Sequence, residues 1–276
     1  MENYLDAAIA IAREAGQVLM AHRGVDFELK GDYDLVTAAD RASEQLIIKR
    51  LRERFPSHGI VAEEGGRAEM DAELRWYVDP LDGTTNFAHG FPMWNVTLAL
   101  ARRGEVIAGL VYDPLNRELF AAERGAGARL NGAPMHVSKA KTINDSLLST
   151  GFPSRKRHQN VNIHFYYQLA MLSHGVRRGG SAAIDLAYVA CGRLDAFWEF
   201  GLNPWDMAAG TLLVEEAGGR VSGMRDEALD LHGRYVLADN ALVHDELIEL
   251  FSEIFAGRYR HDMPGLPAPE WEMHRG

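Results

Sequence analysis

The spacing of apolar residues predicts two helices and then two strands in the N-terminal part of the chain. Apolar side chains recur at helical spacing over residues 4–22. A second helix is expected from just after Thr37 to about Phe55. Short apolar runs at 59–62 and 75–79 predict buried strands. We therefore expect two helices, followed by two strands that end in polar residues.

The pattern of apolar residues in the middle of the chain predicts strands and no helix. Three apolar runs, at 95–101, 106–112 and 118–122, are separated by an Arg-Gly pair and an Asp-Pro pair. Such pairs are typical of turns, so this region is expected to form an antiparallel meander.

The second half again predicts alternating strands and helices. Strands are expected at 146–150 and 195–200, and helices at 159–173, 182–191 and 204–217. The last of these helices has strong end signals, with Asn203 as N-cap and Pro204 in the first turn. No internal repeat or linker divides the chain. We expect one domain over 1–258, made of two closely packed halves (about 1–140 and 141–258), and a flexible tail at 259–276.

Composition narrows the functional classes. The 276 residues are 47% hydrophobic and 25% charged, with a formal net charge of -10. That balance argues against direct nucleic-acid binding, which needs Lys and Arg to neutralise phosphates. Cys191 is the single cysteine, so no intrachain disulfide can form. An acidic N-terminus without a signal-peptide pattern, and the absence of any apolar run near ~18 residues, predict a cytoplasmic protein that does not span a membrane.

The first candidate site is the place where the strand at 75–79 ends. Asp79 is followed by Pro80, Leu81, Asp82 and Gly83. Carboxylates at a strand end suit hard divalent cations, which prefer oxygen ligands. The N–H groups after Gly83 would open a turn or helix whose N-terminus favours an anion. Taken alone, the same residues also fit an ordinary turn.

Three further acids stand at element boundaries, and each also has a structural explanation. Asp40 completes a pattern close to a capping box, Asp206 suits the first turn of a helix, and Glu63 by itself is simply a solvated charge. A fold that gathered all these acids together would raise their pKa values or recruit cations.

Longer motifs resemble one family. Residues 76–87 resemble the first signature of the inositol monophosphatase family of magnesium-dependent, lithium-sensitive phosphatases. Residues 205–219 resemble its second signature, and 35–40 and 63–65 match its early loop and its strand-end acid. The resemblance spans about residues 30–220. It implies an α/β fold, a layered αβαβα sandwich shared with fructose-1,6-bisphosphatase.

The resemblance also implies a metal site. Glu63, Asp79 and the carbonyl of Leu81 would hold a first Mg²⁺, and Asp79, Asp82 and Asp206 a second. A third, weaker ion would lie on Glu63 and waters, and Mn²⁺ is a possible substitute. Mg²⁺ usually binds few carboxylates and keeps several waters, which suits this set.

The catalytic and substrate-binding roles are likewise implied by the resemblance. Asp40, Thr84 and Glu63 would be catalytic, with Thr84 and Asp40 orienting and deprotonating the attacking water. Phosphate would be bound by N–H groups of Gly83 and Thr84, and Glu199 would read an inositol hydroxyl. The full substrate-binding set would be Asp82, Gly83, Thr84, Gly180, Ser181, Ala182, Glu199 and Asp206.

The expected reaction is hydrolysis of inositol-1-phosphate. The alternatives are a related sugar phosphate, such as fructose-1,6-bisphosphate or histidinol phosphate, and an added binding role with the transcription machinery. A homodimer is expected, and a protein partner is possible. The loop at 30–34 is one residue shorter than in animal members, and in the family this loop influences the third metal and the affinity for it. Cys191 is expected to be a core residue and not a nucleophile.

Overall fold

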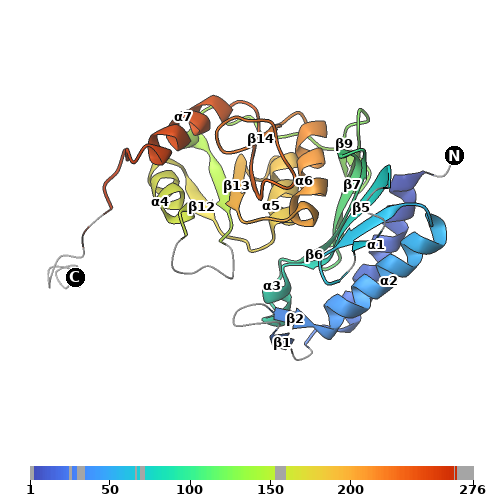
Figure 1. Cartoon of the computed structure of the whole chain (residues 1–276). Coiled ribbons are helices and arrows are strands. Elements are labelled where there is room, and N and C mark those ends of the chain that lie inside the picture. Colours follow the sequence, from blue (N-terminus) through green and yellow to red (C-terminus); the bar gives the residue numbers. More distant parts are fainter. Residues whose placement is uncertain are drawn as a thin grey trace.

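Figure 1 shows the computed structural model of the chain, coloured from the N-terminus to the C-terminus. At 27–29, 35–37 and 67–68 only the backbone is described. The structure as a whole describes residues 3–24, 27–29, 35–65, 67–68, 72–152, 160–263 and 265.

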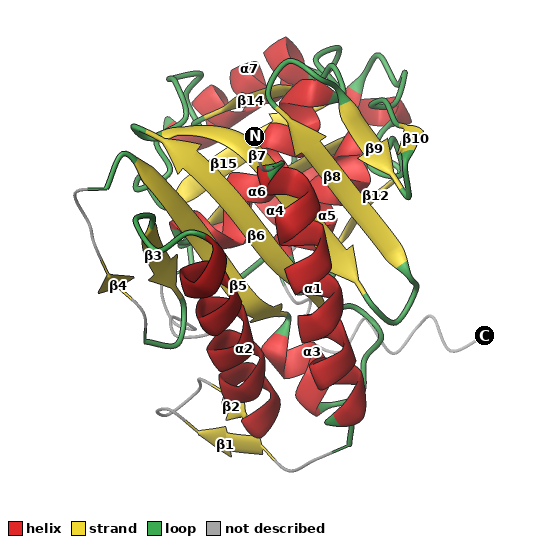
Figure 2. Ribbon diagram, turned by 90° about the vertical axis from the view of Figure 1, so that its right-hand side faces the viewer, coloured by secondary structure: helices red, strands yellow, loops and turns green. Residues whose placement is uncertain are grey.

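Two long helices form the first layer. Helix α1 (Tyr4–Ala21) begins at Asn3, whose side chain accepts hydrogen bonds from the first turn of the helix. Helix α2 (Ala38–Arg54) packs beside α1. A small ribbon of β1 (Phe27–Leu29) and β2 (Leu35–Thr37) connects the two helices. Figure 2 shows α1 and α2 lying across one face of a large sheet.

That sheet has eight strands in the order β10-β9-β8-β7-β6-β5-β3-β4. The predicted antiparallel meander is confirmed as β6, β7 and β8, which pair in sequence order. Strand β3 instead runs parallel to β5, so the two predicted acidic strand ends meet at one edge. The bounds are β3 (Gly59–Ala62), β4 (Arg67–Ala68), β5 (Leu74–Asp82), β6 (Asn95–Arg102), β7 (Glu105–Asp113), β8 (Glu118–Glu123), β9 (Ala128–Leu130) and β10 (Ala133–Pro134).

The second half builds a five-stranded sheet in the order β12-β11-β13-β15-β14. Its strands are β11 (Leu147–Thr150), β12 (Gly175–Arg177), β13 (Ala196–Phe200), β14 (Arg220–Ser222) and β15 (Tyr235–Asp239). Its helices are α4 (Asn162–Leu172), α5 (Ala182–Ala190), α6 (Pro204–Glu216) and α7 (His244–Phe255), with a 3₁₀ turn at Ile143–Asp145.

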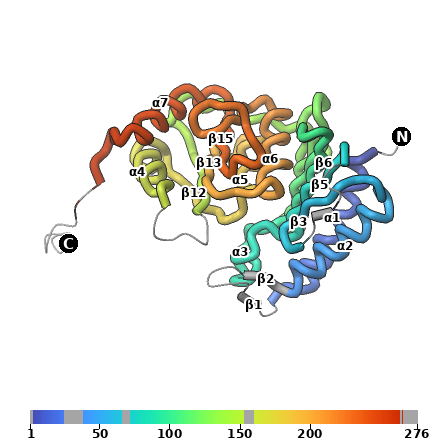
Figure 3. Tube along the Cα trace, in the orientation of Figure 1, coloured from blue at the N-terminus to red at the C-terminus, as the bar shows by residue number. Residues whose placement is uncertain are grey.

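Three buried clusters define the layers. One lies between α1, α2 and the outer face of the large sheet, and includes Trp76 and Ile47. The second joins the inner face of that sheet to α5, α6 and the small sheet, with Phe197 at its centre. The third packs α4 and α7 on the far face of the small sheet. The order is therefore αβαβα, as the resemblance implied, and Figure 3 shows the two halves side by side.

Several elements were not predicted. Helix α7 and strands β12, β14 and β15 are absent from the elements expected above. The predicted tail divides into two parts. Residues 259–262 lie on α4, where Gln168 bonds the backbone of Arg260 and His261. Residues 266–276 lie outside the described part of the chain.

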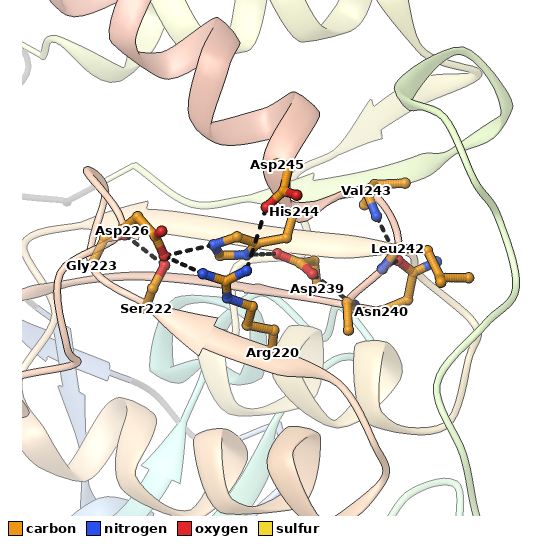
Figure 4. A network of polar contacts seen from close by, with 11 residues as sticks. Arg220, Ser222, Gly223, Asp226, Asp239, Asn240, Leu242, Val243, His244 and Asp245 are labelled. Carbon is orange, nitrogen blue, oxygen red and sulfur yellow. Dashed lines mark hydrogen bonds and ion pairs between the residues drawn. The ribbon is translucent and has the colours of Figure 1, made fainter.

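A buried histidine fixes the start of α7 (Figure 4). Nδ1 of His244 lies 2.6 Å from Asp239 and Nε2 lies 3.1 Å from Asp226. Arg220 bonds the same Asp226 carboxylate at 2.6 Å. Burial alone would lower the pKa of His244, but its hydrogen bonds to Asp239 and Asp226 outweigh burial and raise that pKa. These hydrogen bonds tie together the junction of β14, β15 and α7, and they are strongest when the histidine is protonated.

We predict that His244→Asn costs about 2 kcal/mol of unfolding free energy at pH 6, because it removes hydrogen bonds to charged groups. A raised folded pKa means that this stabilisation is complete below the ordinary histidine value and is lost as pH rises through the folded value. Denaturant unfolding from pH 5.5 to 9 should show the difference from wild type shrinking with pH. His136→Asn, at an exposed histidine, is the control. A difference that grows with pH would contradict the assignment.

Candidate active site

The site begins at a distortion of strand β5. The pairing of β5 with β6 shifts register between Asp79 and Asp82, so the strand is bulged where its two acids lie. A bulge bends a strand and re-aims its side chains. Gly83 follows in a left-handed conformation, φ 89°, and begins the short helix α3 (Thr84–Ala88). A Cβ at Gly83 would lie 2.8 Å from the carbonyl of Met93, so this turn requires glycine.

The predicted acids converge at this turn. Burial, and then the charges of Glu63, Asp82 and Asp206, raise the pKa of Asp79 well above its usual range. Burial also raises the pKa of Asp206 to about 7, with a contribution from Asp82 and against hydrogen bonds from Asn203. The ends of β3 and β5 and the start of α6 therefore place four carboxyl groups within electrostatic reach of one another.

This group of oxygens fits a hard divalent cation by its chemistry. All its side-chain donors are carboxylates, and bound cations would offset the repulsion that raises the pKa of Asp79. The carboxylates do not yet have metal-binding geometry. Within the described residues, no group of three or more His, Cys, Asp or Glu side chains is arranged so that it could hold a metal ion. The fit therefore rests on donor type and charge.

Asp40 and Thr84 lie together, as the resemblance implied. Asp40 is fully buried in the first turn of α2. The Thr84 hydroxyl is 3.0 Å from Asp40 Oδ1 and 3.0 Å from the carbonyl of Leu81. Ser43 donates to the carbonyl of Pro80 at 2.9 Å, which ties α2 to the end of β5. A hydroxyl between a carbonyl and a carboxylate can relay a proton.

Asp82 joins the two halves of the molecule. Its Oδ2 accepts from the Ser181 hydroxyl at 2.6 Å, from Asn95 at 3.0 Å and from the backbone N–H of Ala183 at 2.9 Å. Ser181 is also the N-cap of α5, where its side chain accepts from Ile184. Burial raises the pKa of Asp82 and these hydrogen bonds oppose that rise.

Two asparagines that our sequence analysis missed support this turn. Asn95 donates to both Asp82 and Ser181, at 3.0 and 2.9 Å. Asn86 donates to the carbonyls of Met93 and Gly179, at 2.7 and 2.9 Å, and so holds the loop that carries Gly180. Asn86 lies inside the first signature, whereas nothing around Asn95 distinguishes it from an ordinary first residue of a strand.

Glu199, near the end of β13, lies within electrostatic reach of the same acids. Burial, and then the charges of Asp185, Asp206 and Asp82, raise its pKa well above its usual range, and Arg178 opposes the rise. The carboxyl group covers Gly151, where a Cβ would be 2.1 Å from Glu199 Oε2. Asp185 of α5 was not predicted as a site residue, yet burial raises its pKa to about 8.

The remaining predicted positions agree with a loop and a helix start beside the acids. Gly180 is left-handed, φ 85°, and Ala182 is the first residue of α5. Cys191 caps the other end of α5, half-buried, and burial raises the pKa of its thiol. That thiol suits packing and not nucleophilic attack. The loop at 30–34 lies outside the described residues.

The fold and this acid-lined site correspond to a known class of phosphatase folds. The profile of the inositol monophosphatase family matches residues 1–256. The chain belongs to the inositol monophosphatase family.

Relatives in that family carry two kinds of name. "Inositol-1-monophosphatase" of Synechocystis sp. is 48% identical over 216 residues, covering 78% of this chain and 75% of that protein. "Nus factor SuhB" of Pseudomonas aeruginosa is 43% identical over 250 residues, covering 87% and 92%. Among solved structures, inositol monophosphatase from Anabaena (Nostoc) sp. superposes with a TM-score of 0.83 at 42% identity, covering 89% of this chain and 94% of that one.

We predict that Asp79→Asn makes the metal-free protein more stable at pH 8, by about 2 °C or more in Tm. The folded pKa of Asp79 is raised, so wild type loses stability as pH rises above the ordinary value of an aspartate. The amide keeps the Oδ1 that accepts from Leu81. Thermal unfolding in EDTA at pH 5 and pH 8 checks this. A variant that is less stable than wild type at pH 8 would refute the electrostatic account.

Proposed function

We propose that the protein hydrolyses inositol-1-phosphate to inositol and phosphate with a metal-activated water. The observation that carries this proposal is the convergence of Glu63, Asp82 and Asp206 around the buried Asp79, in a mutually repelling group. Family membership supports a phosphatase. The expected cofactor is Mg²⁺, two to three per site, with Mn²⁺ as a substitute.

The metal site would be built from the first and second signatures. Glu63, Asp79 and the carbonyl of Leu81 would hold one ion, and Asp79, Asp82 and Asp206 a second. When bound, Mg²⁺ supplies Lewis-acid chemistry, which makes a water more acidic and neutralises charge on the leaving oxygen. Asp82 already accepts three hydrogen bonds at Oδ2, so its position is fixed before any ion arrives.

The chain's own residues would move the proton and hold the phosphate. The attacking water gives its proton to the Thr84 hydroxyl, whose own proton passes to Asp40 Oδ1, 3.0 Å away. The water oxygen bonds to phosphorus as the phosphorus–oxygen bond to the leaving group breaks. The leaving oxygen takes a proton from solvent, and Asp40 then returns its proton to solvent. N–H groups of Gly83 and Thr84 orient the phosphate. Glu63 would help to orient this water.

The leaving group would be recognised by residues from the second half of the chain together with Asp82, which we call the leaving-group wall. Glu199 and Asp82 would bond inositol hydroxyls, and the backbone at Gly180, Ser181 and Ala182 would approach the ring. Burial raises the pKa of Glu199, and a carboxyl group can accept hydrogen bonds from inositol hydroxyls. A related sugar-phosphate substrate, fructose-1,6-bisphosphate or histidinol phosphate, would use the same metals with a different fit at this wall.

We expect phosphate release from inositol-1-phosphate to be fastest among inositol-1-phosphate, fructose-1,6-bisphosphate, histidinol phosphate and adenosine 3′,5′-bisphosphate, and to require Mg²⁺. Initial rates with and without Mg²⁺ at equal substrate concentration check this. Hydrolysis of every compound in EDTA at the Mg²⁺ rate would sink the metal assignment. A clear preference for another compound would move the substrate assignment to it.

We expect Glu199→Gln to lower kcat/KM for inositol-1-phosphate about tenfold more than for a generic aryl phosphate. The aryl group offers no hydroxyl for this side chain, so only inositol-1-phosphate loses a hydrogen bond to the carboxyl group. Equal losses on both substrates would argue against a role in leaving-group recognition.

A second candidate function is an added binding role with the transcription machinery. It is favoured by relatives named "Nus factor SuhB". The net charge of -10 disfavours direct nucleic-acid contact, so a protein partner is proposed. Replacing the chromosomal gene by the Asp79→Asn form, expected to be nearly inactive, separates the roles. A phenotype retained in that strain supports the binding role, and loss of every phenotype removes it.

The domain extent, the oligomeric state and the location are proposed from the family to which the chain belongs. We expect one phosphatase domain over 1–258 with its two halves packed together, acting as a homodimer in the cytoplasm, and lithium-sensitive. No helix in the described part of the chain is long and apolar enough to cross a membrane.

A further inference from the structure

The loop between β14 and β15, residues 223–234, approaches the site from the small sheet and was assigned no role above. We refer to it as the strap. It begins after Ser222 at the edge strand β14 and returns at Tyr235 into β15, the neighbour of β13. Glu199, the proposed leaving-group reader, pairs with Val236 of β15. The far end of the strap is therefore beside the leaving-group wall.

The first part of the strap is firmly anchored. Asp226 accepts from Arg220 at 2.6 Å and contacts buried His244 at 3.1 Å, as Figure 4 shows. The N–H of Gly223 donates to the carbonyl of Glu227 at 2.8 Å, which closes the turn around Asp226. These bonds fix the first residues of the strap to β14 and α7.

The last residue of the strap, Arg234, holds the link between two proposed site residues. Its carbonyl accepts from the N–H groups of Gly201 and Leu202, at 2.6 and 3.1 Å. Its Nη2 donates back to the carbonyl of Gly201 at 3.0 Å. The link runs from Glu199 at the end of β13 to Asp206 in the first turn of α6. Arg234 thus bonds the segment that joins Glu199, the proposed leaving-group residue, to Asp206, a proposed metal ligand.

The guanidinium is exposed and has donors to spare. Among the described hydrogen bonds of this side chain, only Nη2 is used, whereas a guanidinium offers five N–H donors. It is near enough to the site that its charge lowers the pKa of Asp206, although burial and Asp82 raise that pKa more. The other nearby arginine, Arg178, instead faces Glu199 and Asp185.

The backbone at Arg234 has φ 64°, a region that favours glycine. An arginine there is mildly strained, of order 1 kcal/mol. Its carbonyl contacts to Gly201 and Leu202 need no side chain, so glycine would satisfy the turn. Beyond the single bond from Nη2 to the carbonyl of Gly201, no described hydrogen bond of this turn uses the guanidinium.

We propose that Arg234 is a specificity-determining residue whose guanidinium, held on the carbonyl of Gly201, binds a second phosphate at the far end of the leaving group. The inference rests on the proposed phosphatase function and deepens it, because it adds sugar bisphosphates to the substrates that the site selects. Planar guanidinium groups bind phosphate through paired N–H donors, which a neutral side chain cannot replace.

The test compares wild type, Arg234→Gln and Arg234→Lys on fructose-1,6-bisphosphate and inositol-1-phosphate. Arg234→Gln should raise KM for the bisphosphate about tenfold with little change in kcat, and KM for inositol-1-phosphate by no more than about twofold. Arg234→Lys should recover part of the loss, because it keeps the charge. Equal effects on both substrates, or no effect on either, would overturn the proposal.

A binding measurement separates this proposal from the proposed function. Calorimetry in EDTA should show fructose-1,6-bisphosphate binding about tenfold more weakly to Arg234→Gln than to wild type. If wild type hydrolyses neither substrate, the phosphatase function fails, and this binding difference still tests Arg234. Equal binding by the two proteins would overturn the role of Arg234 even in an active phosphatase.

Matched controls exclude a folding explanation. Arg117→Gln changes another exposed arginine at positive φ, 56°, in the turn between β7 and β8, and should alter neither KM. Arg234→Gly relieves the backbone strain and should keep or raise the Tm while losing bisphosphate selectivity. A glycine variant that keeps full selectivity would show that the side chain plays no part.

Discussion

Repulsion among the carboxyl groups gathered at the end of β5 is the interaction on which the rest of the structure depends. Asp79 is 2% exposed and is raised in pKa by burial and by three neighbouring acids. Such a group weakens the fold unless something offsets its charge. The surrounding contacts hold it in place: the bulge in β5, the left-handed Gly83, and the bonds that fix Asp82 to Ser181 and Asn95.

The layered architecture explains why the acids can be held there. Strand β5 lies in the large sheet, whereas Asp206 begins a helix of the central layer and Glu199 ends a strand of the small sheet. Asp82 crosses this boundary, since its partners Ser181 and Ala183 belong to α5. The site thus sits where the two halves meet, and the packing of α5 and α6 between the sheets positions its two walls.

Local patterns predicted much of this molecule. The first two helices, the meander and α6 follow from apolar spacing and from end signals such as Asn203 and Pro204. Helix α7 was missed, although Leu247, Leu250, Phe251 and Ile254 have helical spacing and are buried in the structure. Strand β12 is only three residues long, too short for a periodic signal.

Only the site residues that stand within sequence motifs could be predicted. Asp40, Glu63, Asp79, Asp82 and Asp206 stand in signatures, and the structure brings them together. Asp185, Asn95 and Arg234 could not be found in that way, because their surroundings are made by tertiary contacts. Asp185 becomes a site neighbour only when α5 packs behind Glu199. Arg234 does so only when the strap closes on Gly201.

The most direct measurement is calorimetric titration of the metal-free protein with Mg²⁺ at pH 7 in two buffers of different ionisation enthalpy. The account predicts saturable binding with proton release, because the raised pKa values of Asp79 and Asp206 leave protons on the site that a cation must displace. Asp79→Asn should bind weakly and release fewer protons. Saturable binding with no buffer dependence, or no binding by wild type, would contradict the claim that these acids form a cation site.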